Sequence, residues 1–505
     1  MYQPRQILAY GILSFFLVFV LFYGFADSLA KMYPMGARST WGSLNSLKTQ
    51  TDSDLSAPDF SRYDRLKILT SKDFPLDDPT RRIIIVGDIH GMMKSFEKLL
   101  KRVKYSPESD VLVHVGDILA KGPHTGSLSV LRYMASNDIT GVRGNHDQEI
   151  IEWRGWLDRV SSIHGVRSWL DNLENRWNTA HSNGSSSTLE SWLKAERKYS
   201  PRSEKAWWKL IPSDWTIFSD HYKIAKDMSK KDFRYLLKLP LRLYVPSAHT
   251  FIVHAGLLSS DPRYPGDDKS RQPLANVPPL PQPPTATITT SRDESSTKGD
   301  HIKPTSSSKT IEELRNLQEI GILTQIPQNL DPWVVLNMRN IVKGEVSRKT
   351  DKGTPWAETW EEHMEKCVGF NHERRQSIEK EDGEDDEQPD LKVARKLHLS
   401  CYPSTTVFGH TASRGLDVKR WSFGLDSGCV YERRLSALVI QGFTKASNKD
   451  YTPNKDVQNE GNPNGELQDV DDDDDDGSTN ASVKHRLLPF GDRNSATAVS
   501  VKCRR

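Results

Sequence analysis

The sequence predicts an α/β domain built around a largely parallel β-sheet. Short apolar runs rich in β-branched residues recur over residues 82–86, 111–115 and 139–143, as in buried strands. Between them, residues 93–103 and 127–134 repeat apolar side chains at spacings of three and four, which is typical of helices. Strands that alternate with helices imply right-handed crossovers and parallel pairing.

Metal-binding side chains follow each of these three predicted strands, directly after a glycine. The motifs are Gly87-Asp88-Ile89-His90-Gly91, Gly116-Asp117-Ile118-Leu119-Ala120-Lys121-Gly122 and Gly144-Asn145-His146-Asp147. Residues 243–245 predict another strand, and two more, residues 250–253 and 405–408, run into His254 and His410. Because ligands gather at the carboxyl ends of strands in α/β sheets, we expect these side chains to lie together.

These strand ends supply a mixed set of oxygen and imidazole ligands. The candidates are Asp88, His90, Asp117, Asn145, His254 and His410. Such a set suits two divalent metal ions, with Zn, Mn, Co and Fe as alternatives, and the two carboxylate oxygens make Asp117 the natural bridge. One Gly-Asp-x-His motif alone is more often an ordinary turn, but the ordered set indicates hydrolysis of phosphate esters or anhydrides.

On these motifs the chain resembles the calcineurin-like metallophosphoesterases, on the branch of the serine/threonine phosphatases and the bacterial diadenosine tetraphosphatase. The resemblance runs from about Arg81 to Gly442 and is broken by two insertions. It implies an α/β sandwich of two mixed β-sheets flanked by helices, with a dimetal site. In the mechanism we expect, a hydroxide bridging the metals attacks phosphorus, Asp117 holds the metals, and His146 protonates or steadies the leaving group.

The second motif departs from the protein phosphatases at Ala120-Lys121, where those proteins usually carry Asp-Arg. Their aspartate pairs with the histidine that corresponds to His146. Without it, two explanations stay open: another carboxylate, such as Asp147, orients His146, or the leaving group needs less help. Polyphosphates and nucleoside phosphates leave readily, so the departure favours phosphoanhydride substrates.

Cationic side chains near the motifs are candidates for binding substrate phosphates. They are Arg143, Lys121 and Arg339. Residues 331–339, 353–357 and 424–431 resemble the fungal vacuolar, zinc-dependent endopolyphosphatases, so inorganic polyphosphate is the favoured substrate. The alternatives are a serine/threonine-type protein phosphatase, a diadenosine tetraphosphatase-like hydrolase, and a catalytically weak, membrane-tethered interaction protein.

An uncharged stretch of 20 residues from Ile7 to Ala26 predicts a transmembrane signal anchor, preceded by a short tail over residues 1–6. As a helix it would be about 30 Å long, which matches the hydrocarbon core of a bilayer. The apolar region of a cleaved signal peptide is shorter, and a buried core helix would have a polar face. Flanking charges do not decide the orientation, but the short tail and the fungal resemblance favour a catalytic domain in the vacuole lumen.

Composition sets the remaining boundaries. We expect a stalk over residues 27–77, a metallophosphoesterase domain over 78–445 with disordered insertions at about 262–308 and 372–391, and a disordered acidic tail over 446–505. The net charge is +2, and no basic stripe with interleaved aromatic residues points to specific nucleic-acid binding. The expected partners are a polyanionic phosphate substrate and the membrane, and the oligomeric state stays open.

Two further features concern packing. Residues 153–208 are rich in Trp and cations in a mostly helical pattern, which favours a helical cap packed on the sheet over a cap that lines an anion channel. The four cysteines include no Cys-x-x-Cys pair, so a structural zinc cluster is not expected. In a lumenal domain Cys401 can pair with Cys367 or Cys429, and a buried thiol is the simpler role for Cys429.

Overall fold

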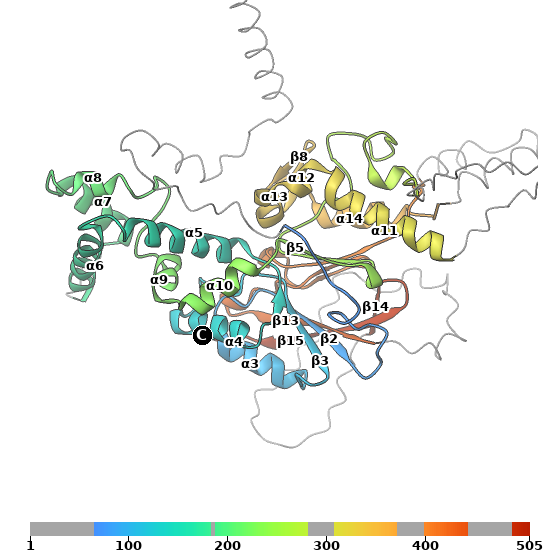
Figure 1. The fold of residues 1–505 in the computed structure, drawn as a ribbon, viewed down its shortest axis with the longest axis horizontal. Helices are drawn as coiled ribbons and strands as arrows, with labels where there is room; N and C mark the ends of the chain where they lie inside the picture. Colours follow the sequence, from blue (N-terminus) through green and yellow to red (C-terminus); the bar gives the residue numbers. More distant parts are fainter. Residues whose placement is uncertain (1–64, 183–186, 281–307, 371–397, 443–486, 505) are drawn as a thin grey trace, which may run out of the picture. The chain divides into compact units, whose positions relative to one another are not determined.

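The fold is described from a computed structural model that covers residues 65–182, 187–280, 308–370, 398–442 and 487–504 (Figure 1). Residues 162–217 form one compact unit, and the rest of the described chain forms another, which contains all the candidate metal-binding motifs. The predicted tail, anchor and most of the stalk lie outside the described residues. Among the described helices, none is long and apolar enough to cross a membrane.

One sheet of the larger unit has six strands of mixed direction. Its order is β14 (Leu487–Phe490), β15 (Asn494–Lys502), β13 (Arg434–Gln441), β2 (Arg82–Val86), β3 (Asp110–His114) and β4 (Thr140–Gly141). Strands β2, β3 and β4 are parallel, whereas β13 is antiparallel to both β2 and β15. The carboxyl ends of the three parallel strands therefore lie at one edge, where the three motifs follow.

The second sheet also has six strands and mixed direction. Its order is β1 (Lys67–Ile68), β5 (Arg242–Val245), β6 (Thr250–Val253), β10 (Thr405–Phe408), β12 (Ser422–Gly424) and β11 (Asp417–Val418). Strands β6 and β10 are parallel neighbours, so the residues that follow them emerge side by side. A separate three-stranded sheet has the order β8 (Glu345–Ser347), β7 (Asn340–Val342) and β9 (Thr354–Pro355).

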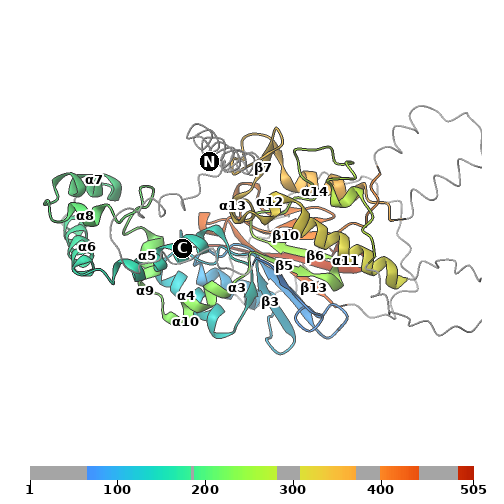
Figure 2. The same ribbon diagram turned by 45° about the horizontal axis from the view of Figure 1, so that its top comes forward.

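The two six-stranded sheets enclose a core of branched apolar side chains, among them Ile83, Ile252 and Leu438. Helices α3 (Met93–Arg102) and α4 (His124–Ser136) lie on the side of the first sheet, and α11 (Ser308–Gln325) and α14 (Trp356–Glu365) lie on the side of the second (Figures 1 and 2). Residues of the second sheet and of α11 and α14 share another apolar cluster. The predicted α/β arrangement with mixed sheets and flanking helices is confirmed.

The remaining helices connect these layers or belong to the smaller unit. In the larger unit they are α5 (Asn145–Val160), α9 (Asp220–Asp227), α10 (Lys230–Lys238), α12 (Pro327–Leu330) and α13 (Pro332–Asn337). In the smaller unit they are α6 (Val166–Ser182), α7 (Leu189–Tyr199) and α8 (Lys205–Trp208). Helix α9 packs beside α5, which begins directly at the third motif.

Most predicted elements form where the sequence indicates. The strands predicted over residues 82–86, 250–253 and 405–408 coincide with β2, β6 and β10. The strand predicted over 139–143 shortens to the two residues of β4. It ends early because the backbone N–H of Arg143 donates to the carbonyl of Pro240 (2.9 Å) and not to β3.

The prediction of a disordered tail over residues 446–505 is wrong for residues 487–504. Strand β15 pairs with β13 from Lys502 opposite Arg434 to Ala496 opposite Ile440, and β14 pairs with β15. The side chains of Ala496 and Val501 are buried. The larger unit therefore does not end at residue 445, because its first sheet includes the two strands β14 and β15.

The insertion predicted over residues 262–308 is also ordered at its start. A short 3-10 turn, Pro273–Ala275, is buried, and the Gln272 side chain donates to the carbonyl of Asp261 (2.9 Å). These contacts fix residues that composition alone classed as disordered. Residues 281–307 and the second insertion, predicted over 372–391, lie outside the described residues.

The smaller unit is helical, as predicted, and its Trp residues pack against one another. The ring centroid of Trp169 lies 5.7 Å from that of Trp207 and 5.3 Å from that of Trp208. Trp177 and Trp192 form another pair at 5.3 Å. These contacts account for the Trp-rich composition within the unit, and its role as a cap stays a prediction.

All four cysteines form disulfides. Cys367 bonds to Cys401, which is one of the two pairings that the sequence left open. Cys429 bonds to Cys503, so the prediction of a buried thiol at Cys429 is wrong. Cys503 follows β15, within the segment predicted to be a disordered tail.

Candidate metal centre

Three of the predicted ligands lie near strand ends in a backbone conformation that residues other than glycine seldom adopt. The φ angles are +48° at His90, +47° at Asp117 and +70° at His410. Left-handed conformations at residues other than glycine are uncommon and cluster at functional sites. Here each lies within four residues of the end of β2, β3 or β10.

The predicted ligands converge on one small volume. The Asn145 side-chain oxygen lies 3.0 Å from His254 Nε2 and 2.9 Å from His410 Nδ1. Asp117 Oδ2 lies 3.4 Å from His254 Nε2 and 3.8 Å from His90 Nε2. One carboxylate thus faces ligands that come from both sheets, which is the position that a bridging ligand needs.

Backbone carbonyls orient two of the imidazoles. His254 Nδ1 donates to the carbonyl of Val115 (2.9 Å), and His90 Nδ1 donates to the carbonyl of Leu119 (3.2 Å). In both rings Nε2 is left to face Asp117. Metal-binding histidines characteristically donate their other ring N–H to such an acceptor, so this pattern fits a metal site.

Glycines make the close approach of the segments possible. A Cβ atom on Gly409 would lie 2.0 Å from Asp88 Oδ1, and one on Gly144 would lie 2.1 Å from Asp117 Oδ1. The backbone N–H of His410 also donates to Asp88 Oδ2 (3.0 Å). The glycines that precede the ligands are therefore required by packing around the carboxylates.

The cluster concentrates buried negative charge. Burial and the neighbouring carboxylates of Asp426 and Asp117 raise the pKa of Asp88. Burial also disfavours the ionised form of Asp117, but the imidazoles of His254 and His146 outweigh it and hold the pKa well below its usual range. A buried set of carboxylates and imidazoles that share one volume suits divalent cations, so the residues present fit the implied metal pair.

Comparison with known proteins agrees with this geometry. Residues 81–253 match the family described as calcineurin-like phosphoesterase. Serine/threonine-protein phosphatase 1 of Salmonella typhimurium is 32% identical over 101 residues, which are 17% of this chain and 46% of that protein. The symmetrical bis(5′-nucleosyl)-tetraphosphatase of Salmonella paratyphi B is 42% identical over 69 residues, 13% of this chain and 24% of that protein.

The chain thus spans less than half the length of these curated relatives. A crystal structure of a protein suggested to be a diadenosine tetraphosphatase is 23% identical to this chain, with a TM-score of 0.35. That comparison covers 75% of this chain and 94% of the other.

His146 lies at the start of α5 beside the ligand cluster. Its backbone N–H donates to Asp117 Oδ1 (2.9 Å). Burial lowers the pKa of the His146 imidazole to about 3. The suggestion that Asp147 orients this ring does not fit, because Asp147 is buried and accepts the backbone N–H of Gly144 (3.0 Å) as a helix cap.

The partner of the His146 ring comes from a segment that the sequence did not single out. His146 Nδ1 lies 2.8 Å from Nε2 of His221 on α9. His221 Nδ1 lies 2.8 Å from Asp220 Oδ1, and its Nε2 lies 3.4 Å from Glu149 Oε2. Burial opposes protonation of His221, but the hydrogen bond with Asp220 and the charge of Glu149 raise its pKa.

Two of the three predicted phosphate-binding cations lie near the cluster. Lys121 is exposed, and its charge acts on Asp88, His90 and His146. Arg339 is half-buried, donates to the backbone carbonyl of His410 (3.3 Å), and interacts with the charge of Asp117. Both positions are compatible with a role at the phosphate.

The prediction that Arg143 binds phosphate does not fit its surroundings. The residue is 1% exposed, and its guanidinium donates to Gln148 Oε1 (2.9 Å) and to the carbonyl of Leu237 (2.8 Å). It also donates to the carbonyl of Leu236 (3.3 Å). Arg143 therefore ties the third motif to the end of α10, which is a packing role.

We expect Arg143→Met to lower stability without a specific effect on substrate binding. Buried carbonyls and the Gln148 amide lose a charged donor, which costs about 2–4 kcal/mol in the free energy of unfolding. Urea unfolding of the full chain measures this loss. Lys121→Met is the matched control, with the opposite outcome expected: unchanged stability and a raised KM. A raised KM in Arg143→Met, with stability unchanged, would indicate that Arg143 does bind substrate phosphate.

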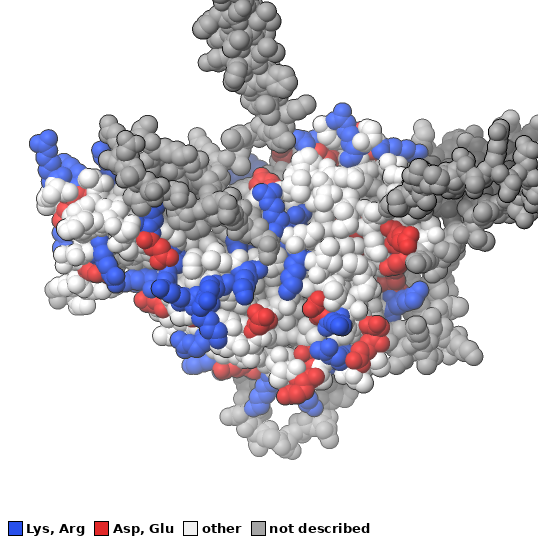
Figure 3. Space-filling model, in the orientation of Figure 1, with Lys and Arg blue, Asp and Glu red and all other residues white. Residues whose placement is uncertain are grey.

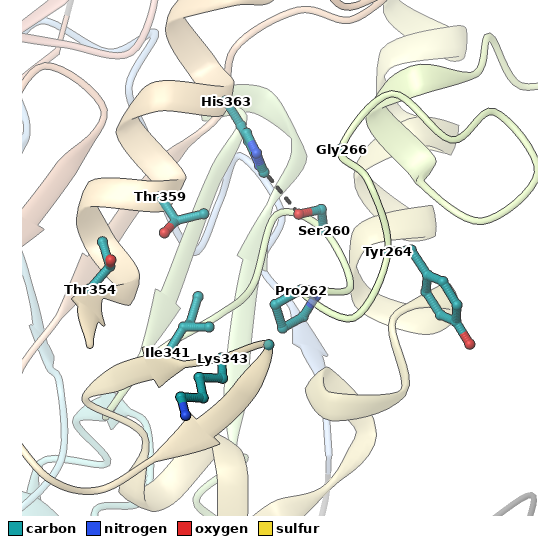
Figure 4. A pocket seen from close by; sticks show the side chains of 10 residues that line it. Ser260, Pro262, Tyr264, Gly266, Ile341, Lys343, Thr354, Thr359 and His363 are labelled. Atoms are coloured by element: carbon teal, nitrogen blue, oxygen red, sulfur yellow. Dashed lines mark hydrogen bonds between the residues drawn. The ribbon is translucent and has the colours of Figure 1, made fainter. Parts of the chain in front are cut away.

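A cavity of about 310 Å³ elsewhere in the larger unit contains none of the predicted ligands. Figure 4 shows its lining, which includes Ser260, Lys343 and His363. The Ser260 hydroxyl lies 3.4 Å and the Ser259 hydroxyl 2.8 Å from His363 Nδ1. Burial lowers the pKa of His363 to about 4, so this ring is neutral at physiological pH and serves as a hydrogen-bonding partner for the serines.

Proposed function

We propose that the chain is a divalent-metal-dependent phosphohydrolase whose active site is the cluster around Asp117. The convergence of Asp88, His90, Asp117, Asn145, His254 and His410 from separate strand ends carries this proposal. The similarity of residues 81–253 to the calcineurin-like phosphoesterases supports the same reaction class. When bound, two metal ions supply Lewis-acid stabilisation of the phosphoryl group and activation of water.

The protein side chains would have separate roles in the reaction. Asp117 connects the two groups of ligands and, through its other oxygen, holds the start of α5. Lys121 and Arg339 are suited to offset the charge that develops on the phosphoryl oxygens. His146 is suited to steady the leaving oxygen, because only its Nδ1 is engaged by His221.

For the substrate, we propose phosphoanhydrides, with inorganic polyphosphate first. The resemblance of residues 331–339, 353–357 and 424–431 to the fungal endopolyphosphatases supports this choice. Basic side chains also gather over α10 on the face shown in Figure 3, where Lys230, Lys231 and Arg234 are exposed. Such a surface favours approach of a polyanion.

The absence of the phosphatase aspartate at Ala120 is weaker support for phosphoanhydrides than the sequence suggested. That argument rested on the second of two open explanations, a leaving group that needs less help, whereas His221 lies within hydrogen-bonding distance of His146. The names of the relatives, a serine/threonine-protein phosphatase and a bis(5′-nucleosyl)-tetraphosphatase, make phosphopeptides and dinucleoside tetraphosphates the competing substrates to test.

For the location, we propose an oxidising compartment, with the vacuole lumen favoured by the fungal resemblance and an N-terminal anchor over residues 7–26. Disulfides persist in secretory compartments and are rare in reducing ones. The bonds Cys367–Cys401 and Cys429–Cys503 support this location.

The proposal is tested with the full chain in detergent, stripped of metal and reloaded separately with Zn, Mn, Co or Mg. We expect polyphosphate to be shortened, with product lengths on a gel distinguishing internal from terminal cleavage. Faster turnover of diadenosine tetraphosphate or a phosphopeptide would reject polyphosphate as the preferred substrate but would still support a metal-dependent phosphohydrolase. No turnover of any substrate with any metal would reject the enzyme.

A further inference from the structure

The second motif makes a contact that its sequence does not suggest. Ala120 and Lys121 adopt left-handed conformations, with φ of +67° and +61°. The backbone N–H of Lys121 donates to Asp220 Oδ2 (2.6 Å). A carboxylate from the start of α9 is therefore held against Lys121, one residue after the position, Ala120, where the protein phosphatases carry an aspartate of their own.

From Asp220 a chain of polar contacts continues to His146. Asp220 Oδ1 accepts from the backbone N–H of His221 (2.9 Å) and lies 2.8 Å from the ring Nδ1 of the same residue. His221 Nε2 then lies 2.8 Å from His146 Nδ1. The side chain of His221 is 10% exposed, so packing between α9 and α5 restrains the ring as well.

We propose that His221, anchored by Asp220 on the backbone of Lys121, is a positioning residue that fixes the ring orientation and tautomer of His146. The inference rests on the proposed phosphohydrolase function and identifies what supports its leaving-group residue. Because the bond to His221 uses Nδ1, the ring presents Nε2 to the leaving oxygen. The carboxylate missing at Ala120 is replaced by one that acts through a second imidazole.

The same side chains raise the alternative of a third metal site. His146, Glu149 and His221 each offer a ligand atom within 4.8 Å of the others. However, nitrogens on a tetrahedral zinc ion lie about 3.3 Å apart, because each Zn–N bond is about 2.0–2.1 Å long. The observed 2.8 Å between the ring nitrogens of His146 and His221 is a hydrogen-bond distance. The geometry therefore favours positioning.

A double-mutant cycle on the metal-loaded full chain tests the proposal. We expect His221→Ala to lower kcat about 10- to 100-fold for phenyl phosphate, whose phenolate is a poor leaving group. For 4-nitrophenyl phosphate, which has a better leaving group, we expect a smaller loss, and for both substrates little change in KM. Because His221 acts through His146, we expect the double variant His146→Ala/His221→Ala to be no slower than His146→Ala alone. Losses that multiply in the double variant would overturn the proposal.

Asp220→Asn provides a second variant that keeps the side-chain oxygen facing Lys121, and we expect a smaller loss of the same kind. His124→Ala is the matched control, because His124 makes a similar bond (2.9 Å) with Asp227 at the other end of α9. We expect it to leave kcat unchanged. Equal losses of kcat in His124→Ala and His221→Ala would show that the effect comes from destabilising α9, and would reject a positioning role for His221.

Two measurements do not depend on turnover. Nitrogen-15 NMR of labelled histidines in the zinc-loaded chain is expected to show one tautomer at His146, and a mixture in His221→Ala. An unchanged tautomer would overturn the proposal even if the chain hydrolyses nothing. Elemental analysis is expected to give the same metal content in both proteins, and the loss of one ion per chain in His221→Ala would establish the third metal site instead.

Discussion

Asp117→Asn should remove metal binding and hydrolysis together, with kcat/KM lowered by about 10³-fold or more, as for loss of an essential catalytic group. Asp117 Oδ1 accepts the backbone N–H of His146, and Oδ2 faces His90 and His254. An asparagine that keeps the first contact must turn its NH2 group toward the imidazoles. A hydrogen-bond donor then replaces an anionic ligand at the centre of the cluster.

Elemental analysis of the variant after dialysis, beside its hydrolysis rate, measures both effects. Asp110→Asn is the control, because Asp110 is another buried carboxylate on the same strand, β3, where it pairs with Arg82 (2.6 Å). It should lose stability while metal content stays at the wild-type level. Wild-type metal content and rate in Asp117→Asn would show that Asp117 does not bridge the metals.

The ligands were predictable because each follows a short strand within a local motif. A β-branched run, a glycine and an Asp, Asn or His lie within a few residues of one another, and parallel strands bring their carboxyl ends to one edge. The direction in which a neighbouring cation points has no such local signature. Arg143 directly precedes the third motif, yet its guanidinium turns to the carbonyls of α10.

The support of His146 could not be predicted because it comes from a helix 75 residues further along the chain. The only local signal is the order Ser219-Asp220-His221, in which Ser219 caps α9 and accepts the N–H of Tyr222. A capping serine fixes where a helix begins, but it does not reveal which strand end that helix faces. That information arises only when α9 packs on α5.

Strand β15 was missed for a compositional reason. The run Asp471 to Asp476 dominates the end of the chain and indicates disorder, whereas residues 494–502 alternate small and apolar side chains in the manner of a strand. Cross-strand pairing with β13 then decides their structure. Composition averaged over a long tail hides a short element that another part of the domain stabilises.

The disulfide Cys429–Cys503, at the end of β15, should contribute strongly to stability. Removing it should destabilise the domain more than removing any single surface contact. The bond joins two residues that are 74 positions apart in the sequence. Loss of such a constraint on the unfolded chain lowers the free energy of unfolding by about 4 kcal/mol. It joins the end of β15 to the turn Cys429–Tyr431. Asp426, three residues before this turn, interacts electrostatically with Asp88 in the ligand cluster. Loosening β15 should therefore also weaken metal retention.

The double variant Cys429→Ala/Cys503→Ala avoids an unpaired thiol, and urea unfolding with metal analysis at increasing urea measures both consequences. Cys367→Ala/Cys401→Ala is the matched comparison: its separation of 34 residues gives a slightly smaller entropic effect, and it lies beside α14. We expect both variants to unfold at lower urea, with early metal loss only in the first. Equal metal retention in the two variants would mean that β15 stabilises the sheet without supporting the metal centre.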